Sequence, residues 1–126
     1  MSNLSIQNTK LRTKEMFERY MNAPKPDGCF LCQEQKPLRE YKYWYVIPND
    51  FSYDNIASET HNMLVLKRHI GKRSELTHEE IQEFYQIVES EHDYETEMFN
   101  YPVAQSVPNH IHYHQIKLDR VVYERK

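Results

Sequence analysis

Three histidines stand at alternate positions in the stretch PNHIHYHQIK, residues 108 to 117: His110, His112 and His114. In an extended strand successive side chains point to opposite faces, so these three would share one face at spacings of roughly 6 to 7 Å. A neutral imidazole binds zinc, and near neutral pH it also acts as a nucleophile or a proton carrier. The row therefore predicts a metal site or catalysis, with a solvated polar strand face as the plain alternative.

The two cysteines of the chain lie close together in the segment CFLC, as Cys29 and Cys32. This spacing suits two thiolate ligands of one metal ion, but zinc takes four ligands, so two more would have to come from elsewhere in the chain. A pair of reduced cysteines without a metal stays open as the alternative. A thioredoxin-like redox role is disfavoured, because the expected strand-to-helix context is missing.

Length and composition narrow the classes of protein. A chain of 126 residues fits one domain with a sizeable core. The net charge of −3 argues against bulk nucleic-acid binding, which needs a basic footprint, although Lys67, Arg68, Lys72 and Arg73 form a small basic patch. No apolar run approaches the roughly 18 residues that span a bilayer, and the polar start lacks a signal-peptide core. We therefore expect a cytoplasmic protein without a membrane partner.

The pattern of apolar residues predicts the elements that position these groups. An amphipathic helix is expected over about residues 10–22, and a second over about 77–91, where Thr77 and Glu80 form a capping box. Strands are expected at 41–47, at 61–69 with a buried centre at 63–66, at 96–100, at 110–118 and at 119–125. This order predicts an α+β domain on an antiparallel sheet of about five strands, residues 29–126, preceded by an N-terminal helical extension, residues 1–28.

Several of these motifs together resemble a known family. HIHYHQI is similar to the histidine triad pattern of the histidine triad (HIT) superfamily of nucleotidyl hydrolases and transferases. The segment THNMLVLKRHIGKRSELTHEEI resembles that family's strand ending in a basic pair and histidine, followed by a capped helix. CFLC and SVPNH lie about where many members carry a Cys-x-x-C and the loop into the triad. The resemblance covers most of residues 29 to 118 and implies a HIT-like fold.

The resemblance implies a reaction at the α-phosphate of a nucleotide or nucleotide conjugate. His112 would attack the α-phosphorus and form a covalent nucleotidyl-histidine, which water or another phosphate then releases. His114 would donate hydrogen bonds to a phosphoryl oxygen or to the leaving group. The expected nucleotide contacts are Gln105 and Ser106 at the phosphate and Asn49 or Asp50 at the ribose.

The resemblance also supplies the two missing metal ligands. In several bacterial members they are the histidine that ends the LVLKRH strand and the first histidine of the triad, here His69 and His110. The implied set is a structural zinc site of Cys29, Cys32, His69 and His110, which separates His110 from the two catalytic histidines. Family members are frequently dimers, so the resemblance also implies a homodimer.

Two other readings remain. The chain has only 2 Gly, and the loop before the triad, NYPVAQSVPNH, holds none of them. Because glycine lets a backbone approach a phosphate closely, their loss favours a zinc-stabilised nucleotide-binding module without turnover. In the third reading the three histidines themselves hold a catalytic zinc, although a row of three is stretched for ligands about 2.1 Å from one ion.

Overall fold

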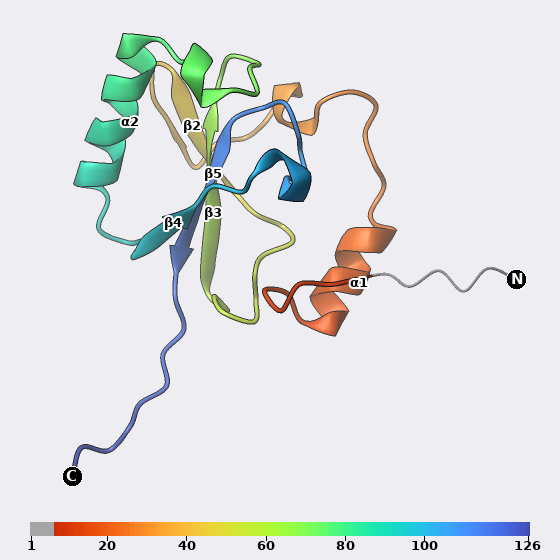
Figure 1. The fold of residues 1–126 in the computed structure, drawn as a ribbon, viewed down its shortest axis with the longest axis vertical. Helices are drawn as coiled ribbons and strands as arrows, with labels where there is room; N and C mark the ends of the chain where they lie inside the picture. Colours follow the sequence, from red (N-terminus) through yellow and green to blue (C-terminus); the bar gives the residue numbers. More distant parts are fainter. Residues whose placement is uncertain (1–6) are drawn as a thin grey trace, which may run out of the picture.

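The protein is a five-stranded antiparallel sheet with one helix on each side, in a computed structural model that describes residues 7–126 (Figure 1). The strands are β1 (Arg39–Glu40), β2 (Trp44–Pro48), β3 (Thr60–Leu66), β4 (Thr96–Met98) and β5 (His112–Lys117), in the order β1-β2-β3-β5-β4. The helices are α1 (Lys14–Asn22) and α2 (His78–Ser90). The α+β class and the five-stranded antiparallel sheet expected from the sequence are confirmed.

Helix α2 covers one face of the sheet. A capping box fixes its first turn, and its apolar stripe packs against the strands. Thr77 Oγ1 accepts from the backbone N–H of Glu80, and the Glu80 carboxylate accepts from the backbone N–H of Thr77, which is the expected capping box. Ile87 packs with the buried residues of the central strands. The core on this face consists of Trp44, Val46, Leu64, Leu66, Ile70, Ile87, Ile111 and Tyr113.

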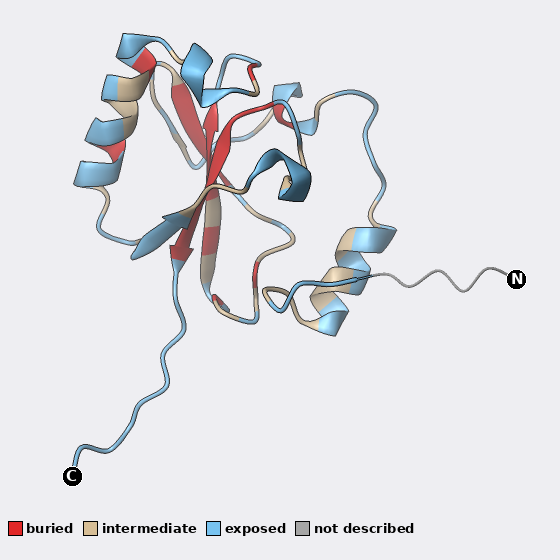
Figure 2. Ribbon diagram, in the orientation of Figure 1, coloured by how far each residue is buried: buried red, intermediate tan, exposed pale blue. Residues whose placement is uncertain are grey.

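The opposite face carries the histidines. Met63 is the cross-strand partner of both Ile47 and His114, and Val65 is the partner of both Tyr45 and His112. Cross-strand partners share a face, so His112 and His114 belong to the face of these apolar side chains. This second layer also contains Leu31, with Val107 and Cys29 at its margin. Buried residues accordingly concentrate in the central strands (Figure 2).

Helix α1 is attached to the loop between β2 and β3. Thr13 caps the helix by accepting from Met16 N–H, and it donates through its backbone N–H and its hydroxyl to the Asp54 carboxylate. Asn55 donates to the carbonyls of Leu11 and Lys10. These contacts hold the N-terminal segment in one place against the domain, although α1 itself has no fully buried residue. Residues 1–6 of the predicted extension lie outside the described residues.

One expected strand is absent: residues 119–125 form no strand and are exposed. The edge of β5 is already paired with β4, so this segment finds no partner there. Asp119 instead accepts hydrogen bonds from the backbone N–H and the hydroxyl of Ser58, and its own N–H donates to Ile56. The fifth strand is the two-residue β1, which the sequence did not predict.

The other boundaries shift by a few residues. The aromatic strand begins at Trp44 rather than at residue 41, because Tyr41 N–H donates to the Trp44 carbonyl and closes a hairpin turn. Strand β5 begins at His112, so His110 precedes it. In residues 7–126 no helix is long and apolar enough to cross a membrane.

Candidate metal centre, histidine network and cavity

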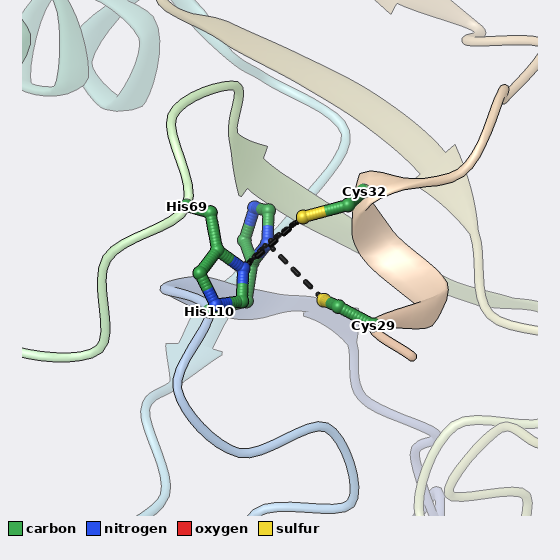
Figure 3. A group of neighbouring side chains, drawn as sticks. All are labelled: Cys29, Cys32, His69 and His110. Carbon is green, nitrogen blue, oxygen red and sulfur yellow. Dashed lines mark hydrogen bonds between the residues drawn. The ribbon is translucent and has the colours of Figure 1, made fainter. Parts of the chain in front are cut away.

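Cys29, Cys32, His69 and His110 gather at one point, as Figure 3 shows. Their four ligand atoms lie within 4.8 Å of one another. His110 Nδ1 is 3.4 Å from each sulfur, Cys32 Sγ is 3.1 Å from His69 Nδ1, and the two Nδ1 atoms are 3.2 Å apart. In a zinc tetrahedron with bonds of about 2.1 and 2.3 Å, neighbouring ligand atoms stand about 3.4 to 3.8 Å apart. The quartet therefore has nearly the spacing that one metal ion needs.

The hydrogen bonding of His110 fits a ligand. Its Nε2 lies 2.6 Å from the Leu66 carbonyl oxygen, which can only accept, so Nε2 carries the proton. Nδ1 then offers a single lone pair, yet three potential partner atoms crowd around it. One lone pair cannot satisfy three hydrogen bonds, whereas a cation at the centre uses it once. Burial also lowers the pKa of His110, which favours the neutral form that binds metal.

The cysteines are placed by a short helical turn. Residues Phe30–Cys32 form one 3-10 turn, which brings Cys29 and Cys32 to the same side of it (Figure 3). The turn is fixed to the sheet because the buried Tyr45 hydroxyl donates to the Leu31 carbonyl at 2.8 Å. Leu31 itself is buried in the histidine-face core. The contacts of Leu31 with the sheet thus fix the positions of the two sulfurs.

The two histidines are brought together by an unusually close approach of two loops. Ile111 N–H donates to the Ile70 carbonyl, so the backbones that follow His69 and His110 lie side by side. Gly71 makes this possible: a Cβ on it would stand 2.8 Å from the Asn109 Cα. Asn109 has a φ of 66°, in the left-handed region that asparagine tolerates. One of the two glycines of the chain is therefore required beside the metal ligands.

His112 has a fixed tautomer. Its Nδ1 lies 2.8 Å from the His110 carbonyl oxygen, so Nδ1 carries the proton and the lone pair is on Nε2. The residue is only 3% exposed, and burial lowers the pKa of the imidazole, which keeps it uncharged. An uncharged imidazole with a free Nε2 lone pair has the electronic form of a nucleophile.

His114 belongs to a buried hydrogen-bonded chain with His61 and Tyr53. The backbone N–H of Tyr53 donates to His61 Nδ1 at 2.8 Å, so His61 carries its proton on Nε2. That Nε2 lies 2.8 Å from His114 Nδ1 and donates to it. The remaining proton of His114 is then on Nε2, which lies 3.2 Å from the Tyr53 hydroxyl. The tautomers of both rings are therefore set by one backbone N–H.

Both rings of this chain resist protonation. Burial, with a smaller contribution from the charge of Arg12, lowers the pKa of His61 to about 4. Burial, together with the His61, His112 and Arg12 charges, lowers the pKa of His114 to about 3. A second proton on either ring would also break the chain of donors and acceptors. The network is therefore neutral at physiological pH.

A cavity of about 560 Å³ opens between the sheet and the N-terminal segment. Asn49, Asp50 and Ser106, three of the four expected nucleotide contacts, line it. Gln105 does not; it donates to the Asn100 carbonyl instead. Neither His112 nor His114 lines the cavity. The lining residues are Arg12, Tyr20, Ala23, Pro24, Lys25, Pro26, Phe30, Gln33, Gln35, Lys36, Ile47, Pro48, Asn49, Asp50, Phe51, Met63, Ser106 and Val107. Met63 joins the two, since it lines the cavity and pairs with His114 across the strands.

The metal quartet is brought together, but the histidine triad is not one ligand set. Within residues 7–126, the only group of potential ligands that could share an ion is Cys29, Cys32, His69 and His110. His110 contacts the two cysteines and His69 through Nδ1. His112 and His114 lie together, with ring centroids 5.4 Å apart. The triad thus divides between two sites.

Sequence reasoning does not single out Tyr53 or His61, which the structure joins to His114. His61 stands two positions before Met63 in a predicted strand, so the two side chains share a face. This alternation was a usable signal. The contact to Tyr53 had no sequence signal, because it depends on how the loop folds back.

Comparisons of the chain with protein-family models, with curated proteins and with solved structures give no match.

Proposed function

We propose that the protein is a HIT-like nucleotidyl hydrolase or transferase that acts at an α-phosphate through a covalent intermediate on His112. The observation that carries this proposal is the fixed tautomer of His112, whose Nδ1–H is held by the His110 carbonyl at 2.8 Å. This leaves the Nε2 lone pair for attack without any proton transfer beforehand. The residue pattern HIHYHQI, which resembles the histidine triad, supplies the reaction class.

The reaction has two displacements at phosphorus. In the first, His112 Nε2 forms a bond to the α-phosphorus, and the bond from phosphorus to the leaving group breaks with its electron pair on the leaving group. In the second, water or another phosphate attacks phosphorus and the P–N bond breaks, which restores His112 and releases the nucleotide. His114 is assigned a supporting role: its Nε2 proton, now directed to Tyr53, stabilises negative charge that develops at the phosphate.

The cavity is the proposed nucleotide site. Its volume of about 560 Å³ falls in the range of small-molecule pockets, roughly 300 to 1,000 Å³. Ile47, Met63 and Val107 offer an apolar surface for a base, while Asn49 and Asp50 offer hydrogen-bonding groups for ribose hydroxyls. Ser106 lies on the loop that leads to the histidines and is proposed as a phosphate contact.

Zinc is the proposed ion of the Cys29, Cys32, His69 and His110 quartet. Two sulfurs and two imidazole nitrogens at tetrahedral spacing are the ligand types that structural zinc prefers. With four protein ligands the site has no open position, so the ion would cross-link the chain and take no part in phosphoryl transfer. It would fix His110, whose carbonyl oxygen in turn orients His112.

A second candidate function is a zinc-stabilised nucleotide-binding module without turnover. Two observations favour it: His112 is only 3% exposed, and neither it nor His114 lines the cavity. In this alternative the nucleotide binds beside Asn49 and Asp50, but its phosphate does not reach Nε2.

Intact-protein mass spectrometry separates the two functions. The protein is incubated with a panel of nucleoside phosphoramidates and dinucleoside polyphosphates of different bases and is quenched at alkaline pH, because phosphohistidine is labile to acid. We expect an added mass of one nucleoside monophosphate, whose value names the base. The adduct and turnover should both disappear in His112→Asn and persist in His78→Asn, which replaces an exposed histidine at the start of α2.

Calorimetry of His112→Asn with the same panel completes the test. Binding to the wild-type protein without adduct or product over hours supports the non-catalytic module. Unchanged turnover in His112→Asn would exclude the covalent mechanism.

A further inference from the structure

The wall of the cavity formed by the N-terminal segment is cationic. Arg12 and Lys25 of this segment line the cavity, together with Lys36 from the stretch before β1, and Asp50 is the one carboxylate among the lining residues. This local excess of positive charge stands out in a chain whose net charge is −3. The sheet side of the same cavity is largely apolar, with Ile47 and its neighbours. A ligand that fills this cavity is therefore expected to carry negative charge where it faces the N-terminal segment of the protein.

Arg12 is held in place for this role. Its Nε donates to the Phe51 carbonyl at 2.8 Å, and its guanidinium stands 4.6 Å from the ring centroid of Tyr20 and 4.9 Å from that of Tyr53. Within residues 7–126, neither of its terminal nitrogens makes a hydrogen bond. A guanidinium fixed at Nε and free at both Nη atoms is a planar pair of donors that matches two phosphate oxygens.

Arg12 also stands beside the proposed chemistry. The centroid of the Tyr53 ring lies 4.9 Å from the Arg12 guanidinium carbon and 4.9 Å from the His114 ring centroid. The positive charge of Arg12 contributes to the lowered pKa values of His61 and His114. The cation is thus about one aromatic ring away from the histidine network.

Lys25 extends the same charged wall. Its Nζ stands 4.2 Å from the Tyr20 ring centroid, so Arg12 and Lys25 both contact one aromatic ring. Tyr20 is in turn packed edge-on against Phe51, which also receives the Arg12 hydrogen bond through its carbonyl. The two cations therefore sit on one built surface rather than on independent flexible side chains.

We propose that Arg12 and Lys25 form an anion subsite, supplied by the N-terminal segment, that binds a phosphate group of the ligand. Its assignment as the subsite for the phosphate beyond the α-phosphate rests on the proposed function, whereas the subsite itself does not. In the first displacement, the bond from the α-phosphorus to its bridging oxygen breaks and the negative charge collects on that leaving phosphate. Arg12 is the group that stabilises it. The subsite selects against leaving groups that are cationic or uncharged.

The test uses inorganic pyrophosphate as the probe and the full-length protein in calorimetry. We expect binding to the wild-type protein that weakens by about 10-fold or more in Arg12→Gln, the loss typical of a charge-assisted phosphate contact. Arg19→Gln is the matched control: it removes an arginine of α1 that does not line the cavity. Its affinity should change less than about 2-fold.

Two further variants guard against loss of folding. Lys25→Gln removes a charge from an exposed side chain that forms no hydrogen bond in the described part of the chain, and it should weaken binding by about 3-fold. Arg12→Lys keeps the charge without the planar fork and should fall between the wild-type protein and Arg12→Gln. Melting temperature and zinc content are measured before and after each titration, because pyrophosphate chelates metals.

The outcomes separate this subsite from the proposed function. Equal affinities in the wild-type protein, Arg12→Gln and Lys25→Gln, or no binding at all, overturn the subsite even if a His112 adduct forms. Arg12-dependent pyrophosphate binding without any adduct supports the subsite and overturns the covalent reaction. With both results positive, pyrophosphate should also compete with adduct formation in the wild-type protein and much less in Arg12→Gln.

Discussion

At the scale of single residues, the hydrogen-bond partner of each histidine decides which ring nitrogen carries the proton. His110 has its proton on Nε2 because of the Leu66 carbonyl, and His112 has its proton on Nδ1 because of the His110 carbonyl. His110 therefore presents the lone pair of Nδ1 to the cysteines, and His112 keeps the lone pair of Nε2 free. The sequence shows only that the residues alternate, and the division of roles came from the resemblance.

Buried neutral histidines make the stability of the protein depend on pH. In the unfolded chain His61 and His114 take up protons near pH 6.5, but in the folded protein only near about 4 and about 3. The unfolded state therefore binds more protons below pH 6.5, and the free energy of unfolding is highest above that pH and falls as the pH drops towards 4. Each group contributes about 1.4 kcal/mol per pH unit at most.

The measurement is urea unfolding at pH 6.5, 5.5 and 4.5 for the wild-type protein and His61→Gln. Glutamine keeps a donor and an acceptor but does not titrate, so the dependence on pH should be shallower by about 1 kcal/mol per unit. The metal ligands contribute equally to both proteins, and His92→Gln, at an exposed position, should behave as the wild-type protein does. Parallel curves for wild type and His61→Gln would mean that His61 is not buried neutral.

At the scale of elements, sequence reasoning succeeded where the signal is local and failed where strands compete for partners. The capping box of Thr77 and Glu80 is a short-range pattern, and α2 begins as expected. The segment 119–125 has strand-forming residues but cannot pair beside β5, because β3 and β4 already occupy both sides of that strand. The metal quartet joins Cys29 to His110, and no local pattern of either segment specifies that contact.

The close approach of the loops that hold Gly71 and Asn109 yields a prediction at Gly71. In Gly71→Ala the new methyl group would meet the Asn109 Cα at 2.8 Å, so the loops that carry His69 and His110 must separate. We expect a loss of about 1 to 3 kcal/mol in the free energy of unfolding and weaker zinc binding. Denaturant unfolding and zinc competition with a chelator measure the two effects.

Gly28→Ala is the comparison for this loop contact. Gly28 has a φ of 74° but nothing within 4 Å of its added methyl group, so only backbone strain of about 1 to 2 kcal/mol is expected. If Gly71→Ala bound zinc as tightly as the wild-type protein, the close packing of the two loops would not be what aligns the ligands.

At the scale of the whole molecule, the metal quartet joins three parts of the chain. Cys29 and Cys32 follow the N-terminal segment, His69 follows β3, and His110 precedes β5. An ion there cross-links segments that are up to 81 residues apart. Such an ion would tie the N-terminal wall of the cavity, with Arg12 and Lys25, to the sheet that carries the histidines.

Removal of the metal should therefore loosen the whole domain. Elemental analysis of the purified protein should find about one zinc per chain, and Cys29→Ser should hold almost none. We expect the melting temperature to fall by about 10 °C or more, the effect of losing roughly 3 kcal/mol in a domain of this size. His92→Asn serves as the control, and bound zinc that persists unchanged in Cys29→Ser would refute the assignment.

The order of strands has a consequence for how the molecule folds. Strands β1, β2 and β3 follow one another as a meander, with a short turn between β1 and β2 and the longer loop 49–59 between β2 and β3. Strand β5 must instead insert between β3 and β4, and its pairing partners include Thr60 with Lys117, far apart in the chain. Closing long loops is slow compared with forming hairpins. That insertion brings His112, the buried histidine chain and the metal quartet together, so we expect the proposed site to form late in folding.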